Sequence, residues 1–263
     1  MSFAAGRWND AGLEKIANSA KTGDDVCKFI FAFQHLCVPP KAAGGNESRK
    51  LRSSAWQILD NNNNGIVSLA ECGKFIQDHL ANFYTSGENK GLGISADEAL
   101  RLYKKFNPCF IRAFLDAADY GAATKVTQKG GGKSYSNTET TGDDFVQFGE
   151  FRLFVTYLCI YATIFDAFGT VGGDITKGND TRVTRGEWDK NCASLRGHPL
   201  DSLSVSSTAN KDKVFKAMDS DGKGMVLLAE FSTYIEDYEY ALGSRWGKLL
   251  NAGEPVVAAP SVE

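Results

Sequence analysis

Oxygen-bearing side chains recur at fixed intervals in the segment 60–71, which reads DNNNNGIVSLAE. Proteins bind calcium through six to eight oxygen atoms, and a twelve-residue loop supplies them from positions 1, 3, 5, 7, 9 and 12. Position 6 is Gly65, where the chain of such a loop must turn sharply. Every ligand position is filled, with a backbone carbonyl at position 7. We therefore predict a calcium site formed by Asp60, Asn62, Asn64, Ile66, Ser68 and Glu71.

Apolar residues at helical spacing flank this loop, over residues 51–59 before it and 69–83 after it. An Asn-rich run followed by Gly is also a common turn. The two flanking helices favour the larger pattern instead, because helix, polar loop and helix together form an EF-hand. Within the loop, Asp60 and Glu71 carry charge. Because affinity rises with the number of charged ligands, we expect weak to moderate calcium binding.

A second loop of the same kind is predicted at 219–230, which reads DSDGKGMVLLAE. Carboxylates stand at positions 1, 3 and 12, and glycine stands at position 6. The defect is position 5, because the Lys223 ammonium brings positive charge where an oxygen ligand belongs. We expect this loop to be the weaker site, with the candidate residues Asp219, Asp221, Lys223, Met225 and Glu230.

Two further loops have lost their ligands. In 139–150 the glycine position holds Asp144, and in 176–187 the first position holds Thr176. We expect the loop 139–150 to pair without binding an ion, since paired EF-hands join short strands at position 8. For 176–187 we do not favour a site either, and the alternative there is an irregular one that uses Asp174 or Asp180. The predicted pairs place Val67 opposite Val146 and Val183 opposite Val226.

The run 151–168 is apolar nearly all round. It is too short between Arg152 and Asp166 to cross a hydrocarbon layer of about 30 Å, so we predict a buried central helix. The predicted fold class is all-α: two EF-hand pairs joined by this helix, with an extra N-terminal helical segment. The predicted domains are an N-terminal extension and linker at 1–47, the first pair at 48–160, the second pair at 161–243 and a tail at 244–263.

Composition sets outer limits on function. The chain has 263 residues, 43% of them hydrophobic, and a formal net charge of −3, so we expect no general attraction to nucleic acid or anionic membranes. The six cysteines have no Cys-x-x-Cys spacing, and we predict reduced core thiols of an intracellular protein. The Met-Ser-Phe start lacks a signal core and a myristoylation glycine, so we also expect no membrane attachment.

Three stretches resemble the calflagins, the flagellar calcium-binding proteins of trypanosomatids. They are RKL before the first loop, DDFVQFGEFRL at 143–153 and YLCIYATIFD at 157–166. The resemblance covers about residues 48–243 and implies four EF-hands, calcium-dependent behaviour and a location in the flagellum or cilium. This chain departs from the family in its start, in its damaged C-terminal loops and in insertions at 121–138 and 169–175.

Two classes of function follow from these patterns. The first is a calcium-binding protein that uses the loop 60–71. The second is a structural protein of the cilium or flagellum, axonemal or microtubule-associated, in which calcium binding is largely vestigial. Either class implies a protein partner. We do not expect an enzyme, because the sequence has no nucleophile–base set, phosphate-binding glycine loop or metal triad.

Overall fold

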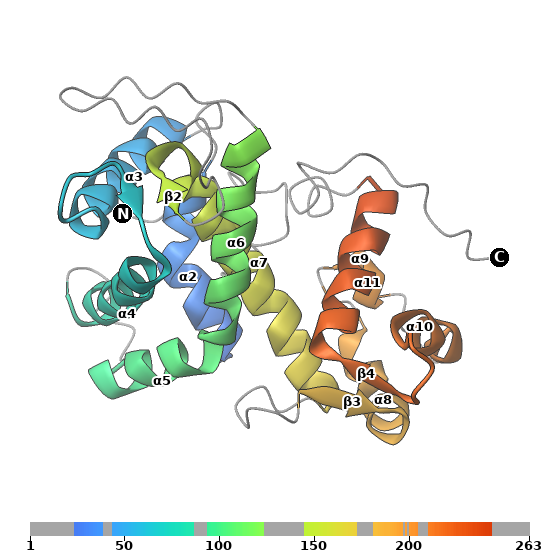
Figure 1. Cartoon of the computed structure of the whole chain (residues 1–263). Coiled ribbons are helices and arrows are strands. Elements are labelled where there is room, and N and C mark those ends of the chain that lie inside the picture. The colour runs from blue at the N-terminus through green and yellow to red at the C-terminus, as the bar shows by residue number, and fades with distance from the viewer. Residues whose placement is uncertain are drawn as a thin grey trace. The chain divides into compact units, whose positions relative to one another are not determined.

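A computed structural model describes residues 24–38, 44–86, 94–123, 145–172, 181–196, 198, 200–204 and 210–243. These parts of the chain are mostly helical, with four short strands (Figure 1). The helical class predicted from the sequence is therefore confirmed. Outside the described residues lie the predicted N-terminal segment up to residue 23, the C-terminal tail from 244 and most of the insertion 121–138.

The described chain divides into two compact units. The first contains residues 32–158, and the second contains residues 24–31 and 159–243. Two helices contribute residues to both units: α2 (Asp25–Cys37) and α7 (Phe148–Val171).

The first unit pairs two loop regions through one strand each. Strand β1 lies antiparallel to β2, with Val67 opposite Val146, as the sequence predicted. Both valines are fully buried. The other elements of this unit are α3 (Gly45–Leu59), β1 (Ile66–Val67), α4 (Leu69–Thr85), α5 (Ala96–Phe106), α6 (Pro108–Ala123) and β2 (Val146–Gln147).

Aromatic side chains join the helices of the first unit. The Trp56 ring of α3 lies 5.7 Å from that of Phe151 in α7, and the Phe75 ring of α4 lies 5.6 Å from Phe151. Both contacts are edge-to-face, the arrangement that aromatic quadrupoles favour. Phe151 therefore connects the two helices that flank the loop 60–71 to the helix that follows β2.

Two boundaries differ from the prediction. Helix α3 already begins at Gly45, inside the N-terminal extension and linker predicted at 1–47, and Gly44 before it is left-handed with φ 81°. Glycine reaches this conformation without a steric penalty, so the turn and the helix start coincide. Helix α6 continues to Ala123 and so includes the first residues of the predicted insertion.

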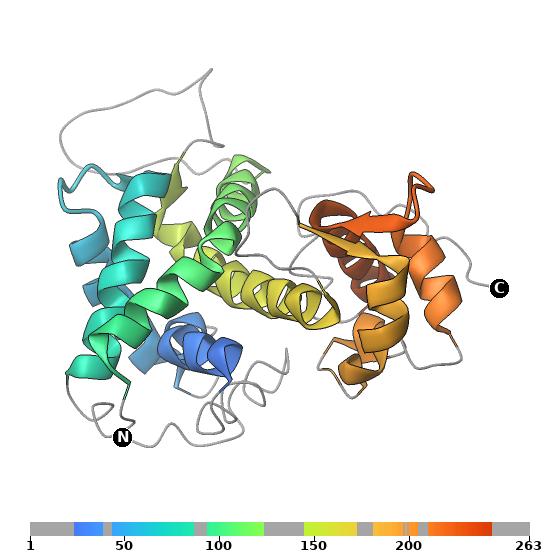
Figure 2. The ribbon, with the colours of Figure 1, turned by 90° about the horizontal axis from the view of Figure 1, so that it is seen from below.

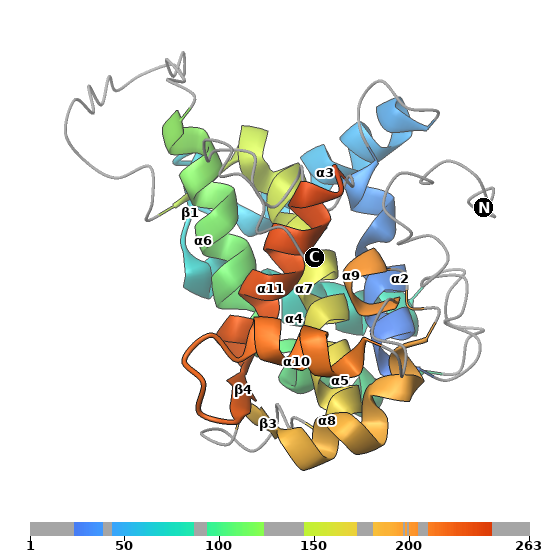
Figure 3. The same cartoon turned by 90° about the vertical axis from the view of Figure 1, so that its right-hand side faces the viewer.

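The second unit repeats the strand arrangement. Strand β3 lies antiparallel to β4 with Val183 opposite Val226, which again confirms the predicted register (Figure 3). The remaining elements are β3 (Arg182–Thr184), α8 (Arg185–Asn191), the 3₁₀ helix η3 (Cys192–Leu195), α9 (Asp201–Ser204), α10 (Lys211–Met218), β4 (Met225–Leu227) and α11 (Leu228–Ala241).

Helix α7 is continuous over its 24 residues (Figure 2). Among the described helices it is the one long and apolar enough to meet the length and composition test for a membrane span. However, 83% of its most apolar window is buried inside the protein. The prediction of a buried helix at 151–168 is confirmed. The helix is apolar on all sides because its neighbours cover it.

All six cysteines are free and buried, as the sequence predicted. Burial raises the pKa of the Cys27 thiol to about 11 and raises that of Cys72 further. A thiol with a raised pKa is a weak nucleophile, because the thiolate is the reactive form. These side chains therefore act as small apolar groups of the core.

Candidate metal-binding loops

The loop 60–71 lies between a helix end and a helix start. Helix α3 ends where the Asp60 N–H donates to the Trp56 carbonyl at 2.7 Å. Helix α4 begins after Ser68, whose hydroxyl accepts the Glu71 N–H at 3.3 Å. The Asp60 side chain is buried, with 4% of its surface exposed. The two helices thus fix the first and last ligand positions of the loop.

Hydrogen bonds from backbone N–H groups hold the loop around Asp60. The two carboxylate oxygens of Asp60 accept the N–H groups of Asn64 and Gly65, each at 3.0 Å. The Asn62 Oδ1 atom accepts the Asn64 N–H at 3.0 Å, and the Asn64 Oδ1 atom accepts the Ile66 N–H at the same distance. Three of the predicted ligand side chains therefore present oxygen atoms to the same short stretch of backbone.

The far end of the loop is a reciprocal helix cap. One Glu71 carboxylate oxygen accepts the Ser68 N–H at 2.8 Å and the Ser68 hydroxyl at 2.7 Å. This capping box satisfies donors at the start of α4 that otherwise have no partner. It also brings together Ser68 and Glu71, the predicted ligands at positions 9 and 12.

The loop 219–230 has the same arrangement. The Asp219 carboxylate accepts the N–H groups of Lys223 and Gly224, each at 2.9 Å, and the Asp221 carboxylate accepts the Lys223 N–H at 3.1 Å. At the other end, Glu230 accepts the Leu227 N–H at 2.9 Å. Positions 1, 3 and 12 thus make equivalent contacts in the two loops.

Three carboxylates of this second loop converge. Single ligand oxygens of Asp219, Asp221 and Glu230 all lie within 4.8 Å of one another. The Lys223 ammonium forms an ion pair with one of these carboxylates, with its Nζ atom 2.6 Å from Asp221 Oδ2. This hydrogen bond lowers the pKa of the Asp221 carboxyl and raises that of the Lys223 ammonium. A cation therefore already neutralises part of the carboxylate charge.

Lys223 is the predicted site residue that the structure does not support as a ligand. Its side chain has no oxygen, and it is 69% exposed while paired with Asp221. An exposed ion pair contributes little stability, so the ammonium can move into solvent at low cost. Met225 stands at position 7, where the backbone carbonyl is the possible donor.

The described parts of the partner loops, 145–150 and 181–187, include the glutamate at position 12. Glu150 accepts the Gln147 N–H and Glu187 accepts the Thr184 N–H, both at 2.8 Å. In all four loops the glutamate at position 12 thus accepts the N–H at position 9. The predicted degenerate positions 139–144 and 176–180 lie outside the described residues.

The donors of the loop 60–71 fit a hard divalent cation. They are carboxylate, amide, hydroxyl and backbone carbonyl oxygens, without a thiol or imidazole, and such sets favour calcium or magnesium over zinc or copper. The loop 219–230 offers three carboxylates and a carbonyl but pairs one carboxylate with lysine. Both donor sets suit calcium chemically, and the first contains no cation that an ion would have to displace.

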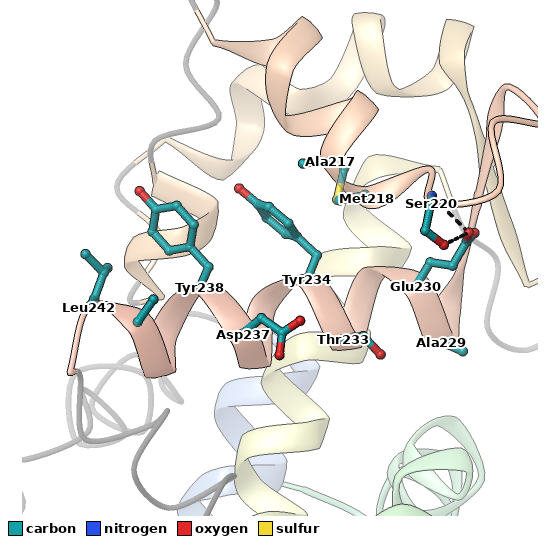
Figure 4. Close-up of a pocket in the computed structure, with 11 residues that line it drawn as sticks. Ala217, Met218, Ser220, Ala229, Glu230, Thr233, Tyr234, Asp237, Tyr238 and Leu242 are labelled. Atoms are coloured by element: carbon teal, nitrogen blue, oxygen red, sulfur yellow. Dashed lines mark hydrogen bonds between the residues drawn. The ribbon is translucent and has the colours of Figure 1, made fainter. Parts of the chain in front are cut away.

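The ligand pattern did not reveal the cavity that lies against the loop 219–230. It has a volume of about 510 Å³ and is lined by the end of α10, by Ser220 and by α11 (Figure 4). The available signal was the four-residue spacing of Tyr234 and Tyr238 on α11, continued by Leu242 at the end of the helix, which places the three on one face.

No protein-family model matches this chain, and a search of curated proteins found no significant relative.

Proposed function

We propose that this protein is an EF-hand calcium-binding protein in which the loop 60–71 is the principal site and the loop 219–230 is a weaker one. One observation carries the proposal. In both loops the position 1 carboxylate accepts the N–H groups of positions 5 and 6, while the position 12 glutamate caps the following helix. These hydrogen bonds therefore hold the ligand positions of both loops in place.

A loop held by such hydrogen bonds favours binding, because less chain entropy is lost in ordering the ligands. The low ligand charge works against it, since each loop carries a formal charge of −2. We expect one or two sites with dissociation constants of about 10⁻⁶ to 10⁻³ M, the range of sensors and weaker modules.

Isothermal titration calorimetry with calcium tests the proposal. Glu71→Gln should remove most binding to the first loop, because a neutral amide replaces the carboxylate that completes the shell. Gln retains an acceptor for the Ser68 N–H, so the helix cap survives. The matched variant Glu230→Gln should affect only the weaker binding. Equal calcium binding by wild type and Glu71→Gln would contradict the assignment of the first loop.

The second candidate is a structural protein of the cilium or flagellum with little calcium response. The burial of α7 favours it, because 83% of its apolar window is already covered. A sensor EF-hand opens on binding and exposes apolar surface, whereas a structural one barely moves. The resemblance to calflagins supports a flagellar location for either candidate, with a protein partner there.

A dye that fluoresces on exposed apolar surface distinguishes the two candidates. The static model predicts no more than a small change when calcium is added, and the same change with magnesium. A large rise that is specific to calcium and reversed by chelator would identify a sensor.

A further inference from the structure

The cavity beside the loop 219–230 is an apolar groove between two helices. Ala217 and Met218 form its α10 side, while Tyr234, Tyr238 and Leu242 line it from α11. In Figure 4 both tyrosine rings project from α11 toward α10, and their centroids lie 5.8 Å apart. Leu242 is 54% exposed. The groove therefore presents apolar surface to solvent within the second unit.

Acidic groups lie at the same groove. Glu230 lines it near the loop, where it accepts the Ser220 hydroxyl at 2.7 Å, and Asp237 lines it further along α11. An apolar floor with carboxylates at its edge fits a segment that combines large apolar side chains with Lys or Arg.

The chain itself continues from the open end of this groove. Helix α11 ends where the Leu242 N–H donates to the Tyr238 carbonyl and the Gly243 N–H donates to the Tyr240 carbonyl. Gly243 is left-handed with φ 66°, a conformation that terminates helices and redirects the chain. The next residues of the sequence thus begin beside Leu242, which lines the groove.

The sequence after Gly243 has the chemistry that the groove would bind. Residues 244–263 read SRWGKLLNAGEPVVAAPSVE. Trp246, Leu249 and Leu250 have the i, i+3, i+4 spacing of helix-in-groove anchors, and Arg245 and Lys248 alternate with them. Trp246 follows Leu242 by four positions, a reach of about 14 Å in an extended chain.

We propose that the groove between α10 and α11 binds the chain's own C-terminal segment. Trp246, Leu249 and Leu250 fill the apolar floor, and the basic side chains face Glu230 and Asp237. The covalent connection favours this occupant over a second copy or a foreign protein, because a short linker gives an effective concentration of about the millimolar range. This inference goes beyond the proposed function, and it needs no bound ion.

Competition between the attached segment and a labelled peptide tests the proposal. The probe is a fluorescent peptide of residues 244–263, and binding is measured by anisotropy with the full chain in chelator and again in calcium. The double variant Trp246→Ala with Leu250→Ala should bind the peptide, because its groove is vacated. Wild type should bind at least tenfold more weakly, because its own segment competes.

Groove-filling variants complete the design. Ala217 is exposed and lines the groove, so Ala217→Trp in the double-variant background should weaken peptide binding at least tenfold without disturbing the core. Ala193 is equally exposed but lies in η3, away from the groove lining, and Ala193→Trp should leave peptide binding unchanged.

Three results would overturn the proposal. The first is that wild type and the double variant bind the peptide equally well. The second is that the double variant does not bind the peptide. The third is that Ala217→Trp leaves peptide binding unchanged. A wild-type dimer that the double variant cannot form would assign the groove to the segment of a second copy instead. Because the chelator arm contains no calcium, failure of the calcium sites leaves the expected result unchanged.

Discussion

The loops 60–71 and 219–230 adopt the same backbone arrangement from different side chains. Position 4 is left-handed in both, as Asn63 with φ 54° and as Gly222 with φ 69°. Position 6 is a left-handed glycine in both, with φ 82° at Gly65 and 77° at Gly224. Position 1 is an aspartate that accepts two backbone N–H groups. The two loops therefore share these backbone features although most of their side chains differ.

The loops differ in how they reach the same formal charge of −2. The first carries two carboxylates and neutral amides, whereas the second carries three carboxylates and a lysine. Ion binding depends on ligand charge and on free oxygen atoms, which loop geometry does not supply. The comparison thus separates the residues that form a loop from those that let it bind an ion.

Lys223→Asn should give the largest change, because it makes position 5 of the second loop the same as Asn64 of the first. Removing a charge about 4 Å from the ion is worth about 1 kcal/mol in water and more near a protein surface. We expect calcium affinity of this loop to rise at least tenfold in calorimetry.

The control for that experiment is Lys213→Asn, which removes an exposed lysine from α10 outside the loop. It should leave calcium affinity unchanged. A rise as large as that of Lys223→Asn would mean that overall charge, and not the ligand position, governs binding.

We expect Gly65→Ala and Gly224→Ala to lower the free energy of unfolding by equal amounts. An added Cβ meets nothing within 4 Å at either position, so the penalty is left-handed backbone strain. We expect a loss of about 1–2 kcal/mol, or a melting temperature lowered by about 2–8 °C.

Gly149→Ala is the matched control, since this glycine also has open space but has ordinary helical geometry in α7. Its melting temperature should stay the same or rise slightly. Unequal losses at Gly65 and Gly224 would show that the two loops are not held in the same way.

Local patterns in the sequence predicted much of this structure. The spacing of Gly65 and Gly224 relative to Val67 and Val226 located both loops, and the count from each loop gave the strand register. These features follow from residues close together in the chain. The groove at Tyr234 and Tyr238 was not predicted, because it depends on how α10 and α11 pack. Lys223 was predicted as the defect of its loop, but its 2.6 Å ion pair with Asp221 was not predicted, because it depends on side-chain geometry.

The partner loops differ from each other in the environment of position 12. Burial raises the pKa of the Glu150 carboxyl to about 7, although the hydrogen bond from Gln147 opposes this shift. Hydrogen bonds from the Thr184 N–H and hydroxyl lower the pKa of the Glu187 carboxyl. The same position therefore favours the neutral acid beside the first loop and the carboxylate beside the second.

This difference predicts a pH dependence of stability that Glu150→Gln removes. Because the folded pKa of Glu150 lies above its ordinary value of 4.5, the folded state holds a proton that the unfolded state has released. The resulting stability is complete below about pH 4.5 and is lost as the pH rises through about 7. We expect the melting temperature in chelator to fall between pH 5 and 8 by about 5–10 °C more in wild type than in Glu150→Gln, because a pKa shift of this size corresponds to about 2.5 kcal/mol over that range. Glu187→Gln should retain the wild-type slope, because the lowered pKa of Glu187 places its loss of stability at more acid pH. An unchanged slope in Glu150→Gln would show that this carboxyl is already ionised in the folded protein.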